Sequence, residues 1–180
     1  MNAGAERALT SSAFELFGLA PAFSLDMDAL EKAYREIQAR VHPDRFAASG
    51  DAERRASLQW TTRVNEAYRM LKSPVQRGKH LLELRGIDVA FETNTAMAPE
   101  FLMQQMELRE GLEEAIGRKS AADLDALRSG LRKSRDQLVQ EIARSIDRDK
   151  DLQAAAEQVR KLMFLERLDE EIDAAYDEVE

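Results

Sequence analysis

The sequence predicts an all-α protein built from two modules. β-branched residues are scattered and no polar/apolar alternation persists, so no strand is indicated. Apolar residues instead recur at spacings of three and four over long stretches, which is the period of an amphipathic helix. This pattern lapses at residues 87–97, where threonine and asparagine appear. We therefore expect a linker there, between helical modules at 12–86 and 98–180.

The first two expected helices precede a proline-containing loop. A short helix covers residues 13–19 and is closed by Pro21, because proline cannot continue a helix. Asp26 is a suitable N-cap for a second helix that runs through Val41. Its inner face would carry Leu30, Tyr34, Ile37 and Val41.

Two further helices complete the first module. The third is expected at about 51–72, antiparallel to the second. Ser73 and Pro74 fit the N-cap and N1 positions of a fourth helix, which ends at Gly86. One face of the third helix holds Trp60, Val64, Ala67 and Leu71.

The second module is expected to be an antiparallel bundle. Its helices cover about 98–117, 121–146 and 152–178, and Ser120 with Asp123 fits a capping box variant at the start of the middle one. The residues that the middle helix would bury are Leu124, Leu127, Leu131, Leu138, Ile142 and Ile146.

Composition excludes several classes of protein. The chain has no cysteine, so disulfides and thiolate metal sites are ruled out and a reducing cytoplasm fits best. The N-terminal segment lacks the apolar core of a signal peptide, and no run approaches the length of a membrane span. Residues 1–90 hold 13 basic and 12 acidic residues, whereas 91–180 hold 13 and 22. The acidic second half argues against a nucleic-acid surface.

The tripeptide His42-Pro43-Asp44 ends the second helix. Proline pushes the residue before it out of the helical region, so the His and Asp side chains are expected on a loop. Without context, such a histidine is an ordinary loop residue, or forms an acid/base pair with the aspartate. No second group of catalytic residues and no P-loop accompanies them, so we do not expect an enzyme.

This arrangement resembles a J-domain: a helix with basic outer residues, then HPD, then a longer antiparallel helix carrying VNEAYRML at 64–71. The segments FELFGLAPAFSLD, HPDRFA, NEAYRMLKSPVQRGKHLLELRGIDV and FLMQQMELREGLEE extend the match from about residue 14 to the end. They resemble the HscB-type co-chaperones of iron-sulfur cluster assembly. The absence of cysteine, together with a short leader, is similar to the bacterial form rather than to eukaryotic members with a CxxC module.

The resemblance implies a J-domain at 12–86 and a scaffold-binding three-helix domain at 98–180, in an L-shaped arrangement. It implies that the J-domain binds a DnaK-type ATPase chaperone (HscA) and stimulates its ATP hydrolysis, while the bundle binds the cluster scaffold (IscU). No cofactor or metal is implied. The expected chaperone-binding residues are the HPD loop and a basic patch beside it: His42, Pro43, Asp44, Lys32, Arg35, Arg40 and Arg45.

The first helix of the second module has a surplus apolar face. At 100° per residue, Phe101, Leu108, Leu112, Ala115 and Ile116 form one arc, which suffices for a core. A second arc carries apolar and acidic side chains, and either packs against the first module or binds a partner. The resemblance implies scaffold binding by these residues: Leu102, Met103, Met106, Glu107, Glu110 and Glu114.

Phe164 on the last helix is expected to join this surface. It lies about 100° from the stripe of Leu152, Ala156, Val159 and Met163, so it would emerge between helices. The resemblance implies that it contacts the scaffold, and an ordinary core role is the alternative.

Two other readings of the whole chain stay open. The acidic residues of the surplus face are similar to those of di-iron bundles, but such sites also need histidines and none follows His80. General J-proteins act on unfolded clients, yet this chain lacks their Gly/Phe linker and zinc-finger cysteines. A helical interaction module without a chaperone role is the remaining alternative.

Overall fold

The computed structural model describes residues 12–46, 49–89 and 98–179. All regular elements in these ranges are helical, which confirms the predicted all-α class. The chain divides into two compact units between Leu81 and Leu82, within a helix. Residues 90–97 of the predicted linker lie outside the described residues, so the linker bounds and the L-shaped arrangement stay predictions.

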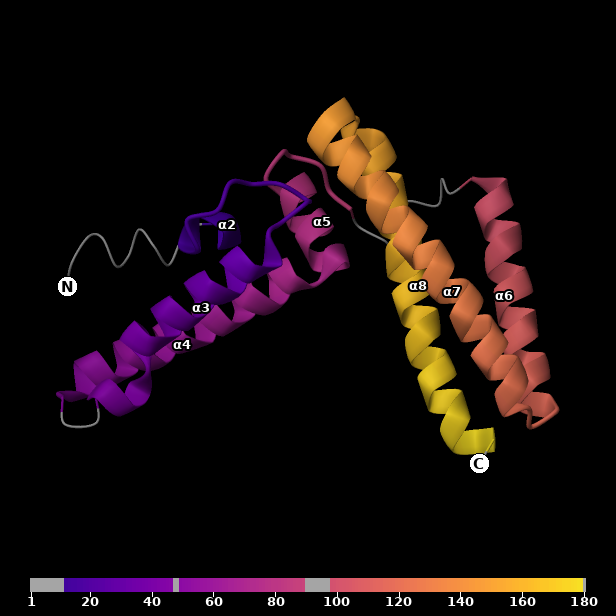
Figure 1. Ribbon diagram of the computed structural model, residues 1–180, viewed down its shortest axis with the longest axis horizontal. Coiled ribbons are helices and arrows are strands. Elements are labelled where there is room, and N and C mark those ends of the chain that lie inside the picture. The colour runs from indigo at the N-terminus through magenta and orange to yellow at the C-terminus, as the bar shows by residue number, and fades with distance from the viewer. Residues whose placement is uncertain (1–11, 47–48, 90–97, 180) are drawn as a thin grey trace. The chain divides into compact units, whose positions relative to one another are not determined.

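The first unit is organised around two long antiparallel helices, α3 (Met27–Val41) and α4 (Asp51–Lys72), which lie side by side (Figure 1). The short helix α2 (Ala13–Leu16) packs on α4, and the short turn η1 (Pro43–Phe46) follows α3. Helix α5 (Pro74–Glu83) begins in this unit. The predicted cap of α3 is confirmed, because Asp26 Oδ1 accepts hydrogen bonds from the amides of Asp28 and Ala29, each at 3.0 Å.

The first helix ends earlier than predicted. The helix expected at 13–19 stops at Leu16, because Gly18 adopts a positive φ of 66° that favours glycine. The amide of Leu19 then donates back to the Phe14 carbonyl at 2.9 Å, which satisfies the helix end. Pro21 therefore lies beyond the helix and does not close it.

Half of the core positions predicted on the two long helices of the first unit are buried, and the other half are half-buried. On α4, Val64, Ala67 and Leu71 are buried, whereas Trp60 is half-buried. On α3 only Leu30 is fully buried. The other inward residues of α3 are half-buried; among them, Tyr34 stacks on Tyr68 with ring centroids 4.1 Å apart and donates to Asn65 at 2.9 Å.

The second unit contains α6 (Pro99–Gly117), α7 (Ala121–Ala143) and α8 (Leu152–Val179), each packed on the other two. The predicted capping box of α7 is half confirmed: Ser120 Oγ accepts from the amide of Asp123 at 3.2 Å, but the Ser120 amide donates to the Ala115 carbonyl at 3.0 Å rather than to the Asp123 side chain. The α-helix of α7 ends at Ala143, before the predicted bound, and a π-helical turn η2 (Arg144–Asp149) follows it. Lys150 closes this turn with φ 57°. The core cluster includes Phe101, Leu112, Ala115, Leu124, Leu131, Phe164, Leu165, Leu168, Ile172 and Ala175.

The buried surface of α8 is wider than the predicted stripe. Ala156 and Val159 are buried as expected, but Leu152 and Met163 are only half-buried. Phe164 is buried instead. The reason is that α8 packs on both α6 and α7, so side chains on more than one stripe leave solvent.

Candidate functional site

The His42-Pro43-Asp44 loop sits on the C-terminal end of α3. His42 caps the helix with an extended backbone (φ −57°, ψ 130°), as expected for a residue before proline. Its Nδ1 atom accepts a hydrogen bond from the Asp44 amide at 3.3 Å and lies 3.5 Å from Asp44 Oδ2. The His42 side chain is 48% exposed and that of Asp44 is 91% exposed, so the loop offers both to a partner.

The predicted basic residues flank this loop. Lys32, Arg35 and Arg40 are exposed on α3, and Arg45 is exposed just after the HPD tripeptide. Arg35 lies 3.6 Å from Glu31 across one helical turn, and a guanidinium nitrogen of Arg45 donates to the Ala39 carbonyl at 3.0 Å. Lys32 and Arg40 are eight residues apart, about 12 Å along the helix. Basic residues are therefore spaced along α3 to the loop, among the exposed carboxylates of Glu31 and Glu36.

A second exposed surface lies on α6. Leu102, Met103 and Met106 are 43%, 58% and 62% exposed, while Phe101 and Leu112 on the core side are each 6% exposed. We call these three apolar residues, with the exposed carboxylates beside them, the α6 face. Its residues are Leu102, Met103, Met106, Glu107, Glu110 and Glu114.

The acidic rim of the α6 face is partly paired. Arg118 donates to Glu114 Oε2 at 3.0 Å, one turn further along the chain. Both side chains remain about two-thirds exposed, at 66% and 65%. The pair is therefore a weak, solvated contact that a partner could replace at little cost.

The expectation that Phe164 emerges between helices is wrong. Its side chain is 3% exposed and belongs to the core cluster of the second unit. The ring meets that of Phe101 edge to face, with centroids 5.6 Å apart, and the Arg109 guanidinium lies 5.9 Å from its centroid. Phe164 therefore supports α6 from its buried side, behind the α6 face.

This chain is similar to known proteins in sequence. Residues 97–173 match the family model described as the HSCB C-terminal oligomerisation domain. A co-chaperone protein HscB homolog from Burkholderia vietnamiensis is 51% identical over 172 residues, which cover 96% of this chain and 98% of the relative. The chain belongs to the HscB co-chaperone family.

Solved HscB structures share the fold. Chaperone HscB from Vibrio cholerae matches with a TM-score of 0.79 at 35% identity, over 94% of this chain and 100% of that one. The human co-chaperone HscB matches with a TM-score of 0.85 at 30% identity, over 92% and 82% of the two chains. The J-domain and C-terminal helical bundle of this HscB family member are therefore those of its relatives.

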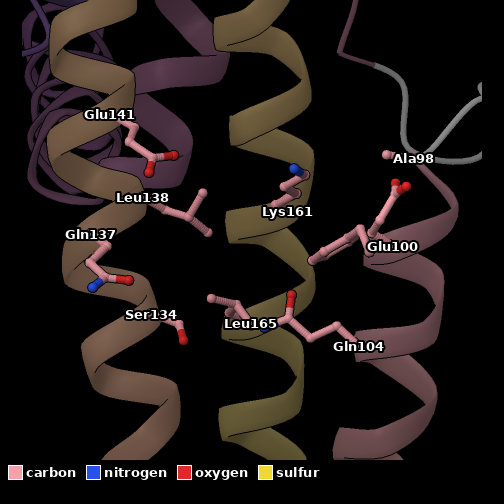
Figure 2. A pocket seen from close by; sticks show the side chains of 10 residues that line it. Ala98, Glu100, Gln104, Ser134, Gln137, Leu138, Glu141, Lys161 and Leu165 are labelled. Atoms are coloured by element: carbon pink, nitrogen blue, oxygen red, sulfur yellow. The ribbon is translucent and has the colours of Figure 1, made fainter.

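A groove of about 310 Å³ opens beside the core of the HscB C-terminal bundle (Figure 2). Lys161 and Leu165 on α8 form its middle, between Glu100 on α6 and Glu141 on α7. The Lys161 ammonium lies 5.4 Å from the centroid of the Phe101 ring. The lining thus mixes apolar contact with charges of both signs and lacks a nucleophile paired with a base.

Within residues 12–46, 49–89 and 98–179, no three His, Asp or Glu side chains are grouped to hold a metal ion. No helix in the described ranges is both long and apolar enough to cross a membrane.

Sequence reasoning missed two residues that support the HPD loop. Ser57 and Thr61 on α4 donate hydrogen bonds from their hydroxyls to the Val41 carbonyl, at 2.6 and 3.2 Å. The only signal in the sequence is a pair of hydroxyl residues four apart, and such a pair is common on exposed helices. Their role depends on how α4 docks against α3.

Proposed function

We propose that this chain is a cytoplasmic co-chaperone without catalytic activity, which brings an iron-sulfur cluster scaffold (IscU) to a DnaK-type chaperone (HscA) and stimulates its ATP hydrolysis. The observation that carries the proposal is the presence of two exposed, chemically different surfaces on separate units of one chain. One is the polar HPD loop with its basic flank. The other is the apolar α6 face with its acidic rim.

The HPD loop is proposed to contact the chaperone. The Asp44 amide donates to His42 Nδ1 at 3.3 Å, and both side chains remain exposed to a partner. Exposed cations along α3, such as Lys32, would attract an acidic surface of the chaperone and speed the encounter. Hydrolysis itself takes place in the chaperone, so the loop acts by binding one of its conformations more tightly.

The α6 face is proposed to hold the scaffold. Met103 and Met106 are flexible and polarizable, which suits a surface that must fit a partner's shape. Glu107 and Glu110 at the rim would select a partner that presents cations there. Because one chain binds both proteins, the scaffold is held at high local concentration beside the chaperone.

The experiment measures the steady-state ATPase rate of HscA with this chain, with IscU, and with both. We expect modest stimulation by the chain alone and a rate with both that exceeds the sum of the separate increments. A His42→Gln variant is the matched control, because the exposed loop substitution leaves both helical cores intact. Additive rates, or equal stimulation by the variant, would contradict the proposal.

A pull-down distinguishes the general J-protein alternative. The chain is immobilised and offered IscU and an unrelated denatured protein in equal amounts. We expect retention of IscU and loss of retention in a variant of the α6 face. Equal retention of both by the wild-type chain would favour a co-chaperone for unfolded clients.

A further inference from the structure

The last carbonyl of α3 has lost its usual backbone partner. In an uninterrupted helix the Val41 carbonyl would accept from the amide four residues later, that of Arg45. Here the Arg45 amide donates to the His42 carbonyl at 3.1 Å, and the Asp44 amide donates to His42 Nδ1 at 3.3 Å. Pro43 has no amide proton. The HPD tripeptide thus turns the nearby backbone donors away from Val41.

Two hydroxyl groups on α4 take the place of the missing backbone donor to the Val41 carbonyl. Ser57 Oγ donates to the Val41 carbonyl at 2.6 Å and Thr61 Oγ1 donates to it at 3.2 Å. Ser57 and Thr61 are four residues apart and so lie on one face of α4. A carbonyl oxygen has two lone pairs, so it accepts both hydrogen bonds. The residue just before the HPD loop is therefore tied to the neighbouring long helix.

Ser57 is too deeply buried to bind a partner directly. Ser57 is 4% exposed, so its side chain has almost no surface to offer to another protein. Asp44, by contrast, is 91% exposed at the side chain. Any influence of Ser57 on a chaperone must pass through the backbone that it holds.

We propose that Ser57 and Thr61 are positioning residues of the HPD loop. By satisfying the Val41 carbonyl they fix the end of α3 against α4, and this presents His42 and Asp44 to the chaperone in one orientation. The inference rests on the proposed function for its ATPase readout. Its structural part, the ordering of the loop, is measurable on the free protein.

The test compares two double variants, one that keeps a hydroxyl donor at residue 61 and one that has none there. Ser57→Ala/Thr61→Ser retains one donor to the Val41 carbonyl, whereas Ser57→Ala/Thr61→Val retains none and keeps the shape of threonine. Ser73→Ala is the control, because Ser73 caps α5 by accepting from the Gln76 amide at 3.2 Å, away from the loop. Ser57→Ala, Thr61→Val and Ser73→Ala each remove one hydroxyl from the same unit.

Two measurements report on the loop: amide exchange reports its order, and the stimulated ATPase rate reports its function. We expect the Asp44 and Arg45 amides to exchange with solvent at least tenfold faster in the variant without a hydroxyl than in the variant with one. We expect the maximal stimulated ATPase rate of HscA to fall at least tenfold, with IscU affinity unchanged. The Ser73→Ala control should match the wild-type chain in both readouts, even where its melting temperature falls.

Equal amide exchange and equal stimulation by the two double variants would overturn the inference. Faster exchange with unchanged stimulation would also overturn it, because an ordered loop would then be unnecessary. If the wild-type chain fails to stimulate HscA, the proposed function fails. Amide exchange then decides the positioning role by itself.

Discussion

Truncating the apolar part of the α6 face should weaken scaffold binding strongly while leaving the fold intact. The perturbation is the triple variant Leu102→Ala/Met103→Ala/Met106→Ala. These side chains are 43–62% exposed, so about half of each remains for a partner to bury. Full burial of such a side chain contributes about 1.5–3 kcal/mol, so half contributes about 1 kcal/mol. Three of them contribute about 3 kcal/mol, which corresponds to a roughly hundredfold increase in Kd.

Isothermal titration with IscU measures this change, and thermal unfolding checks the fold. Because the replaced atoms already face water and alanine favours helices, the melting temperature should hardly move. Leu58→Ala is the matched control for loss of an exposed apolar side chain, since Leu58 is 56% exposed on α4 in the other unit. It should bind IscU as the wild-type chain does.

Phe164→Ala is the control for a substitution that does damage the core. Removing this 3% exposed ring from the core should cost about 3–5 kcal/mol of stability and lower the melting temperature of the second unit by at least about 12 °C. A triple variant that binds IscU normally would refute the assignment of the α6 face. A triple variant that unfolds as readily as Phe164→Ala would refute the claim that its residues lie outside the core.

Three further predictions concern the loop, its basic flank and a half-buried carboxyl. His42→Gln or Asp44→Asn should remove HscA stimulation in the ATPase assay, because each substitution removes polar contacts on an exposed loop. Helicity measured by circular dichroism should not change. Near-normal stimulation would count against the HPD assignment. Lys32→Glu/Arg35→Glu should slow association with HscA in stopped-flow measurements, more at low salt than at high salt, and a salt-independent loss would indicate damage to the fold. Burial raises the pKa of Glu166 above its ordinary value of 4.5. Its contribution to stability is thus present below that value and is lost as pH rises through the raised pKa, so Glu166→Gln should raise the unfolding free energy in urea at pH 7 more than at pH 4. An equal gain at both pH values would contradict this shift.

Local chemistry in the sequence was enough to predict most helix bounds and the surface-exposed loop. Asp26 caps α3 whatever packs around it, because a short acidic side chain reaches the amides of its own first turn. α4 runs from Asp51 to Lys72, as predicted, between a loop and a Ser-Pro pair. The proline of the HPD tripeptide ends α3 at Val41 for an equally local reason.

The exposed α6 face also follows from the sequence, because one arc of α6 already suffices for the core. Met103 and Met106 lie on the remaining arc and are exposed, as the period of the helix requires. The periodic pattern is reliable here because α6 lies at the side of the bundle and leaves one face uncovered.

Some contacts depend on tertiary packing and cannot be predicted from the apolar period of any single helix. Phe164 is buried because α8 packs on two helices at once, so an apolar residue far from its main stripe still finds a neighbour in Phe101. Ser57 and Thr61 reach the Val41 carbonyl only after α3 and α4 dock, since the donors and acceptor are 16 and 20 residues apart in the chain. Such contacts depend on the rotation and register of one helix against another, and local propensity and capping do not encode either quantity.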